Sequence, residues 1–204
     1  MKKLAVLLIV AGILTMLYPV ANRTYISHRQ EKILENWEDS CEIVEPPPPV
    51  EEERIIQEES AVETESLSAV QGTDPVAVLF IEKIDLEIPV FLGATRANLR
   101  LGAGLLDTGV LLGEKGNVVI TAHRSHSYGM QFNRLDEIEV GDEVLVKTKM
   151  GEYRYVAYAT QIVEPARISL IDAQGDASLL TLVTCHPLYS RDPPYRLVVQ
   201  ASMN

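Results

Sequence analysis

The amino-acid sequence predicts a mostly β domain with a closed sheet or barrel, preceded by a membrane-spanning helix and a tether. From Val76 onward, short apolar runs rich in β-branched residues alternate with turn residues. An uncharged N-terminal segment and a stretch rich in glutamate and proline come before that point. The short, closely spaced runs are typical of a barrel or closed sheet rather than of a parallel α/β core.

The N-terminal segment has the length and composition of a membrane anchor. Leu4 to Val20 contains no charged residue, and as a helix it would span about 26 Å, just enough for a bilayer core. The preceding Lys2 and Lys3 favour an N-terminus in the cytoplasm. A cleaved signal peptide is the alternative, although Pro19-Val20-Ala21 is a poor cleavage site. We therefore expect residues 1–22 to form a single-pass anchor and the rest of the chain to be extracytoplasmic.

Residues 23–75 have the composition of an acidic tether. Between Gln30 and Pro75 there are 14 Asp and Glu residues and two basic residues, whereas the whole chain carries a net charge of −11. The rest of the chain is therefore near neutral, and the acidity indicates a solvated, self-repelling segment with no nucleic-acid partner. Pro46 to Pro49 would end any helix and form an extended spacer.

Apolar residues recur at helical spacing in the first part of this tether. They are Ile26, Ile33, Leu34, Trp37, Cys41 and Val44. Two interpretations stay open. The anchor helix continues out of the membrane and places this stripe against a partner, or it forms a marginal helix that frays.

Residues 76–204 are expected to form the barrel, and about 130 residues suffice to bury a core. We predict seven strands, at Val76–Ile81, Leu86–Phe91, Val118–Ala122, Glu143–Lys149, Tyr153–Ile162, Leu179–Cys185 and Arg196–Ala201. Gly102-Ala103-Gly104 is interpreted as one of the connections. Phe132 to Ile138 is interpreted as a short helix.

Three residues with complementary chemistry stand at the ends of these strands. Cys185 ends one apolar run, Arg196 opens the next, and His123 follows the run that ends at Ala122. A thiol becomes a good nucleophile beside a cation, and Arg196 with backbone N–H groups would stabilise an oxyanion. His123 would protonate a departing amine and then deprotonate an incoming one. These steps describe a transpeptidase, and with water as the acceptor they describe a thiol peptidase.

Each of these residues also has a purely structural interpretation. A lone cysteine that ends an apolar strand is most often a small buried hydrophobe. His126 and His186 compete with His123 for the imidazole role, but His126 lies in a polar loop and His186 should point to the opposite face from Cys185. A Cys41–Cys185 disulfide is not expected, since it would consume the nucleophile.

No metal site is expected. No pair of cysteines or histidines has the spacing of a structural zinc site. A group of loop carboxylates would suit calcium, but it reads more simply as a solvated helix-turn segment. These carboxylates are Asp136, Glu137, Glu139 and Asp142.

The sequence from about Val76 to Ala201 resembles the sortases, membrane-anchored cysteine transpeptidases of Gram-positive bacteria. The resemblance is carried by several motifs in the same order. They are Ile81-Glu82-Lys83-Ile84-Asp85-Leu86-Glu87-Ile88-Pro89-Val90, Asn98-Leu99-Arg100-Leu101-Gly102-Ala103-Gly104, Gly116-Asn117-Val118-Val119-Ile120-Thr121-Ala122-His123-Arg124, Phe132-Asn133-Arg134-Leu135-Asp136, Thr181-Leu182-Val183-Thr184-Cys185 and Arg196-Leu197-Val198-Val199.

The resemblance implies a closed barrel of about eight strands in which His123, Cys185 and Arg196 are catalytic. It also implies that Thr184 and Ala122 contact the substrate. Substrates of this family are proteins with an LPxTG-like sorting motif, which is cleaved after its threonine and held as a thioester. The acyl group then passes to an amine of a cell-wall precursor or of a pilin lysine, on the outer face of a bacterial cell membrane. No cofactor is expected, although calcium assists some members.

Features of two sortase classes are present. Cys185-His186-Pro187-Leu188-Tyr189 and the long loop before Arg196 are most similar to class D. Ala122-His123-Arg124 is similar to the pilin-polymerising class C, but class C members have an aromatic residue after an Asp-Pro pair, and here Val76 follows Asp74-Pro75. The alternatives to a cell-wall transpeptidase are a class C enzyme that joins pilins, a thiol peptidase, and a non-catalytic tethered interaction module.

Overall fold

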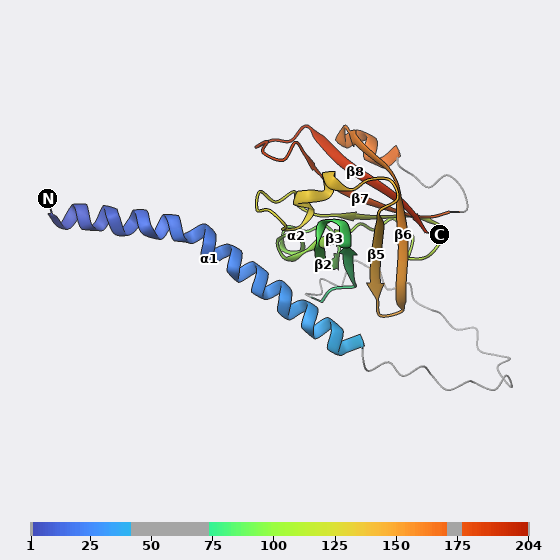
Figure 1. Ribbon diagram of the computed structural model, residues 1–204, viewed down its shortest axis with the longest axis horizontal. Helices are drawn as coiled ribbons and strands as arrows, with labels where there is room; N and C mark the ends of the chain where they lie inside the picture. The colour runs from blue at the N-terminus through green and yellow to red at the C-terminus, as the bar shows by residue number, and fades with distance from the viewer. Residues whose placement is uncertain (1, 42–73, 171–176, 204) are drawn as a thin grey trace, which may run out of the picture.

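The computed structural model describes residues 2–41, 74–170 and 177–203, so the proline spacer and the Glu-rich part of the tether lie outside it. Eight strands close into a barrel, and a long helix runs past it (Figure 1). This confirms the mostly β, closed-barrel prediction. The elements are α1 (Lys2–Cys41), β1 (Ala77–Ile81), η2 (Glu82–Ile84), β2 (Leu86–Leu92), α2 (Arg96–Leu101), β3 (Ala103–Leu105), β4 (Gly116–Thr121), η3 (Phe132–Glu137), β5 (Glu143–Thr148), β6 (Gly151–Val163), η4 (Pro165–Leu170), β7 (Ser178–His186) and β8 (Tyr195–Met203).

The order of strands around the barrel brings distant parts of the sequence together. The order is β1-β2-β3-β4-β7-β8-β6-β5, and β5 pairs back to β1. The pairs β2–β3 and β4–β7 are parallel, and the other pairs are antiparallel. A parallel pair needs a long crossover connection, and η3, β5 and β6 all lie between β4 and β7. As a result β7 lies between β4 and β8.

One strand lies where the sequence predicts a connection. Ala103–Leu105 pairs in parallel with Val90–Leu92 on one side and antiparallel with β4 on the other. A Cβ at Gly102 would overlap the carbonyl oxygen of Pro89, and a Cβ at Gly104 would lie 2.8 Å from the carbonyl oxygen of Gly93. These two glycines therefore permit close approach of neighbouring backbones, and the prediction of a connection here is wrong. The seven predicted strands and the short helix at residue 132 are confirmed.

Alternating side chains fill the barrel from every strand. Leu180 and Leu182 of β7 and Leu197 and Val199 of β8 belong to the large interior cluster. A second, smaller apolar cluster lies on the other face of three neighbouring strands. Its fully or nearly buried members are Val119, Val183 and Val198. Burial of these apolar surfaces drives formation of the barrel and gives β4, β7 and β8 two packed faces near one end.

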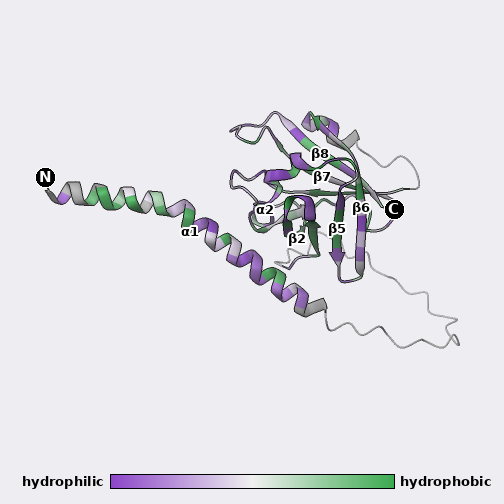
Figure 2. Cartoon of the chain, viewed as in Figure 1, coloured by the Kyte–Doolittle hydropathy of each residue, from purple (hydrophilic) through white to green (hydrophobic). Residues whose placement is uncertain are grey.

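The second half of α1 packs against the barrel. Figure 2 shows that the first half of this helix is largely hydrophobic and the second half largely hydrophilic. Gln30 Nε2 donates a hydrogen bond of 2.7 Å to the carbonyl oxygen of Leu101, and Trp37 is only 6% exposed. The ammonium of Lys149 lies 5.5 Å from the centre of the Trp37 ring. The predicted apolar stripe therefore contacts the barrel of its own chain through Trp37, whereas Val44 lies outside the described residues.

The helix continues without a break across the predicted boundary between residues 1–22 and 23–75. Among the residues that the structure describes, no helix is both long enough and apolar enough to span a membrane. The division into anchor, tether and barrel stays a prediction.

Candidate active site

Cys185 and Arg196 face each other across two hydrogen-bonded strands. They are Cα partners in the antiparallel pairing of β7 with β8. Cys185 is a free cysteine, and both residues are half-buried. Side chains directly opposite each other on one face of an antiparallel pair are close neighbours. The apolar runs that end in the cysteine and begin with the arginine are thus adjacent strands.

His123 reaches the same place from the other side of β7. The parallel pairing of β4 with β7 sets Thr121 beside Val183. One residue further on, the backbone N–H of Ala122 donates to the carbonyl oxygen of Val183 at 3.3 Å, and the hydroxyl of Thr184 donates to the carbonyl oxygen of Ala122 at 2.9 Å. His123 and Cys185 are the next residues along these two adjacent segments.

The alternation of the strands places all three side chains on one face. Val119, Val183 and Val198 form the outer cluster, and residues two positions along a strand share a face. Cys185 follows Val183 by two positions, and Arg196 precedes Val198 by two. Continuing β4 past Thr121 gives His123 the same face as Val119. The structure therefore gathers His123, Cys185 and Arg196 above an apolar floor on three neighbouring strand ends.

The guanidinium of Arg196 is held by backbone carbonyl groups. Its Nη1 donates to the carbonyl oxygens of Pro193 and Tyr195, at 3.0 and 2.8 Å. Within the described part of the chain, no carboxylate forms an ion pair with this arginine. The loop before β8 thus orients the group and leaves its positive charge available for an oxyanion.

The loop after His123 is closed by hydrogen bonds that fix the backbone of the histidine. Its carbonyl oxygen accepts from the N–H of Phe132 at 3.1 Å. The amide of Gln131 donates to Leu99 O at 2.6 Å, and that of Asn133 donates to Ser125 O at 2.6 Å. Sequence reasoning missed both amides. The sequence feature that could have indicated them is that Gln131 and Asn133 flank the start of the predicted helix at Phe132.

An ionic network around the buried Arg124 links the residues that follow the histidine and the cysteine. The side chain of Arg124 is 3% exposed, and its guanidinium contacts Asp136 Oδ2 and His186 Nδ1, each at 2.7 Å. Because the guanidinium can only donate, Nδ1 of His186 is the acceptor. Arg124 Nε is buried without a hydrogen-bond partner among the described residues. His186 is thus engaged with Arg124, one residue beyond the thiol, and sequence reasoning missed the role of Arg124.

The other sequence-based candidates lie nearby with different surroundings. Thr184 and Ala122 are 1% and 4% exposed and are hydrogen-bonded to each other, and their contact with substrate stays a prediction. His126 is exposed, and its ring centre lies 5.5 Å from that of Tyr189.

The loop carboxylates considered for calcium are all engaged in ion pairs. Asp136 pairs with Arg124, and Glu137 pairs with Arg134 at 2.7 Å. Arg134 holds the pKa of the Glu137 carboxyl below its ordinary value, since it donates hydrogen bonds to the ionised form. Glu139 and Asp142 lie 3.0 and 3.7 Å from the ammonium of Lys83. Across the described residues, no group of three His, Cys, Asp or Glu side chains is arranged to hold a metal ion.

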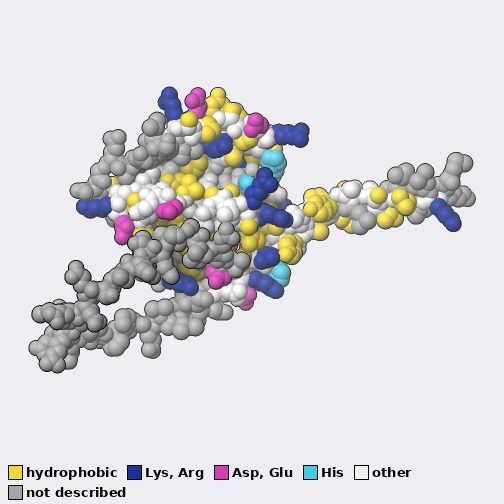
Figure 3. All heavy atoms as spheres, turned by 180° about the vertical axis from the view of Figure 1, so that it is seen from behind, with side chains coloured by type: hydrophobic (Ala, Val, Ile, Leu, Met, Phe, Trp, Pro, Cys, Tyr) yellow, Lys and Arg dark blue, Asp and Glu magenta, His cyan; other side chains and the backbone are white. Residues whose placement is uncertain are grey.

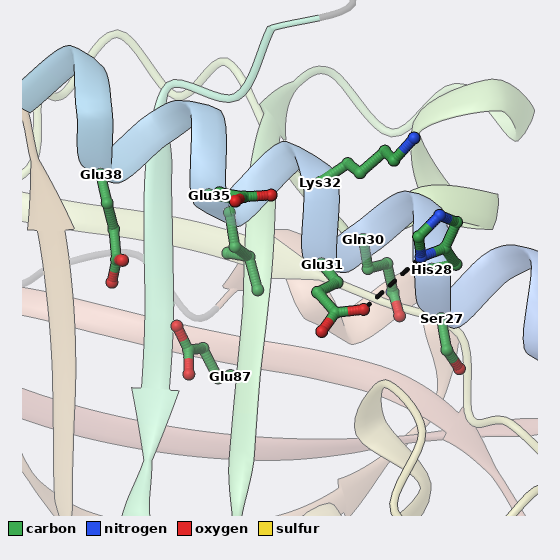
Figure 4. Close-up of a pocket in the computed structure, with 9 residues that line it drawn as sticks. Ser27, His28, Gln30, Glu31, Lys32, Glu35, Glu38 and Glu87 are labelled. Atoms are coloured by element: carbon green, nitrogen blue, oxygen red, sulfur yellow. Dashed lines mark ion pairs between the residues drawn. The ribbon is translucent and has the colours of Figure 1, made fainter.

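Two cavities lie along α1, and they differ in charge. The larger, of about 830 Å³, is lined by Glu31, Glu35 and Glu38 of α1 and by Glu87 of β2 (Figure 4). Burial raises the pKa of Glu87 above its ordinary value, and the nearby charge of Glu38 adds to this. The smaller cavity, of about 420 Å³, includes His123 in its wall. The cavity next to the candidate site is therefore the smaller one.

Known proteins are similar to this chain in fold and in sequence. A family model described as a sortase domain matches residues 79–204. A sortase D of Bacillus subtilis is 31% identical over 123 residues, and a sortase A of Listeria monocytogenes is 28% identical over 110 residues. The crystal structure of Streptococcus agalactiae sortase C1 in complex with MTSET has a TM-score of 0.59 and 26% identity, and it covers 64% of this chain and 67% of that one.

The extent of the similarity differs between these proteins. The Bacillus match covers 60% of each chain, and the Listeria match covers 54% of this chain and 49% of the relative. The structure of a Clostridium perfringens sortase D5 transpeptidase covers 87% of this chain and 97% of its own, with a TM-score of 0.61 and 21% identity. At that identity the likeness is one of fold.

Proposed function

Because the chain belongs to the sortase family, we propose that it is a cysteine transpeptidase that attaches proteins bearing an LPxTG-like sorting motif to an amine of a cell-wall precursor. The observation that carries this proposal is the cross-strand pairing of Cys185 with Arg196 on the face that His123 also reaches. A thiol, an imidazole and a guanidinium that forms no ion pair with a described carboxylate, all on adjacent strand ends, are the groups that acyl transfer requires.

In the first half of the reaction, the thiolate of Cys185 attacks the carbonyl carbon of the threonine in the sorting motif. The new C–S bond places negative charge on the carbonyl oxygen, and Arg196 stabilises it together with a backbone N–H near the cysteine. The tetrahedral intermediate collapses as the C–N bond breaks, and His123 donates a proton to the departing amine. The acyl group is then a thioester on Cys185.

In the second half, an acceptor amine replaces the departed one. His123, now neutral, removes a proton from the amine as its nitrogen attacks the thioester carbonyl. Arg196 stabilises the second oxyanion, and the C–S bond breaks to release the thiolate. Because His123 is exposed, the acceptor must outcompete water at this step. If water wins, the same groups act as a thiol peptidase.

The N-terminal half of α1 supports a further part of the proposal, that the enzyme is anchored in a bacterial cell membrane with the barrel outside. Leu4 to Val20 is uncharged and follows two lysines. Many of its apolar side chains are exposed, including Leu7, Ile13 and Leu17. Labelling of intact cells by an impermeant maleimide tests the orientation: in a Cys185→Ala background, Cys41 should react. Labelling only after lysis would contradict it.

The experiment that tests the transpeptidase proposal traps the covalent intermediate. The full chain in detergent is incubated with a panel of sorting-motif peptides, and its intact mass is measured. We expect an adduct of the acyl fragment on the wild-type protein and on Cys41→Ala, the matched control, but not on Cys185→Ala. Addition of an amine should convert the adduct into the amide product. Cleavage that persists in Cys185→Ala would sink the proposal.

A further inference from the structure

The cavity that contains His123 is shared by α1 and the barrel. Its lining includes Asn22 and Arg23 of α1 and Leu99 and Arg100 of α2. The loop after β4 closes the cavity and carries His123. Arg23 also donates a hydrogen bond of 3.4 Å to the carbonyl oxygen of Tyr128 in that loop. The helix therefore completes a pocket at one of the candidate catalytic residues.

The described residues that line this cavity carry positive charge. They include Arg23 and Arg100 and no Asp or Glu, although the chain as a whole has a net charge of −11. Within the described residues, neither guanidinium forms an ion pair with a carboxylate. By contrast, Arg124, Arg134 and Arg154 all have carboxylate partners. Figure 3 shows Lys and Arg side chains gathered near a histidine where the helix leaves the barrel.

The cavity reaches His123 from the side away from Arg196. In the barrel β3 and β4 lie on one side of β7, and β8 lies on the other. Arg100 is on α2, which leads directly into β3, whereas Arg196 opens β8. The carbonyl oxygen of the acyl donor would lie at Arg196. The amine that loses its proton to His123 must also reach the thioester on Cys185, so an acceptor whose amine lies between these two residues would extend its remaining groups past the imidazole into this cavity.

We propose that this cavity binds the acceptor, and that Arg23 and Arg100 select acceptors that carry an oxyanion group, a carboxylate or a phosphate, close to the reacting amine. This inference rests on the proposed transpeptidase function. Unpaired guanidinium groups bind carboxylate and phosphate with two parallel hydrogen bonds, and a cleft lined by one sign of charge concentrates counter-ions. The anion would hold the acceptor so that its amine reaches His123, and α1 would thereby become part of the substrate site.

The chain offers a matched control for each arginine. Arg29 lies on α1 like Arg23, and Arg96 lies on α2 like Arg100, but neither lines the cavity. All four residues are exposed. Arg29→Ala and Arg96→Ala therefore remove the same charge from the same helices without changing the cavity. A general effect of net charge would appear in all four variants.

The test measures transfer from a sorting-motif peptide to paired acceptors by the full chain in detergent. The pairs are glycine with glycinamide, and O-phosphoethanolamine with ethanolamine. In Arg23→Ala and in Arg100→Ala we expect KM for the anionic member to rise about fivefold and KM for its neutral twin to stay unchanged. Because the variants do not alter the basicity of the amines, a change in the ratio of KM for the anionic acceptor to KM for the neutral acceptor must come from the altered cavity. The first pair tests a carboxylate and the second tests a phosphate, so the results separate these two sources.

Two further readouts decide the outcome. The rate of thioester formation should be the same in all four arginine variants. Arg29→Ala and Arg96→Ala should also keep the wild-type ratio of KM for the anionic acceptor to KM for the neutral one. Equal KM changes for anionic and neutral acceptors, or equal effects of the control variants, would overturn the inference. A thioester that forms normally without any anion preference would refute this inference alone. Absence of the thioester in the wild-type protein would refute the proposed function itself.

Discussion

Nη1 of Arg124 lies 2.7 Å from Nδ1 of His186, and this contact joins the segment that carries the candidate histidine to the strand that carries the candidate cysteine. Arg124 directly follows His123 in the sequence, and His186 directly follows Cys185. The contact is part-buried, and Arg124 is also paired with Asp136. Such a network holds the two segments in one geometry only while every member keeps its partner.

Replacement of His186 should therefore weaken both the fold and the reaction. His186→Ala leaves a buried guanidinium without one of its acceptors, which should cost about 1–3 kcal/mol of unfolding free energy. His186→Asn keeps an acceptor oxygen near the position of Nδ1 and should restore most of the loss. Urea unfolding and kcat/KM for peptide cleavage measure the two effects. Equal behaviour of the two variants would show that the contact with Arg124 is not what His186 provides.

Arg196→Lys should slow thioester formation severely. Lysine keeps the charge but cannot hold its donors in the fork that the two backbone carbonyls orient. We expect a loss of about 10²–10³ in the acylation rate with a small change in KM, as for removal of one oxyanion donor. The rate of release of the first product measures it. Arg154→Lys on the exposed surface of β6 is the control, and a loss of less than about threefold in Arg196→Lys would contradict the oxyanion role.

The stability of the contact between α1 and β2 should depend on pH through Glu87. Its folded-state pKa is raised from 4.5 by burial and by Glu38. The folded state thus favours protonated Glu87, and this stabilisation is complete below the ordinary pKa and is lost as pH rises through the raised folded value. Glu87→Gln should therefore raise Tm slightly at pH 7 and have no effect near pH 4. A higher Tm of the variant at both pH values would contradict this account.

Trp37→Ala should release the C-terminal half of α1 from the barrel. Truncation of a buried Trp costs about 3–5 kcal/mol, and here the loss falls on the helix–barrel contact. Hydrogen exchange of residues 22–41 should accelerate, while exchange in β7 and β8 stays slow. Tyr25→Ala, at a position 56% exposed on the same helix, is the control. Unchanged protection of α1 in Trp37→Ala would show that the helix is held by other contacts.

Gly102→Ala should destabilise the barrel strongly. The added Cβ would overlap the carbonyl oxygen of Pro89, which is backbone and cannot move aside without shifting β2. We expect a loss of at least about 2 kcal/mol of unfolding free energy. Gly12→Ala, whose Cβ would have nothing within 4 Å, should be tolerated. Thermal unfolding compares the two, and equal Tm values would show that β2 and β3 separate at little cost.

The sequence predicted the barrel strands wherever a run of neighbouring residues has the composition of a strand. The runs that became β7 and β8 are apolar and β-branched, and their ends are marked by Cys185 and Arg196. β3 was missed because a three-residue strand with Gly104 at its centre and Gly102 just before it carries no such signal, and its pairing with β2 depends on the absence of side chains at these two glycines. The helical spacing of the apolar residues around Trp37 was also evident from the sequence, but the surface that they contact, the barrel of the same chain, was not.

The sequence by itself determined the chemistry available to this protein: one thiol, one imidazole and one guanidinium at the ends of apolar runs, with a periodicity that predicts strands. Tertiary structure alone decided that β7 lies between β4 and β8, that Arg124 bonds to His186, and that α1 closes a basic cavity beside His123. The physical reason is the distance along the chain over which each effect acts. Strand propensity and side-chain chemistry reside in a few neighbouring residues, whereas pairing, burial and ion pairing depend on which distant surfaces lower the free energy when they meet.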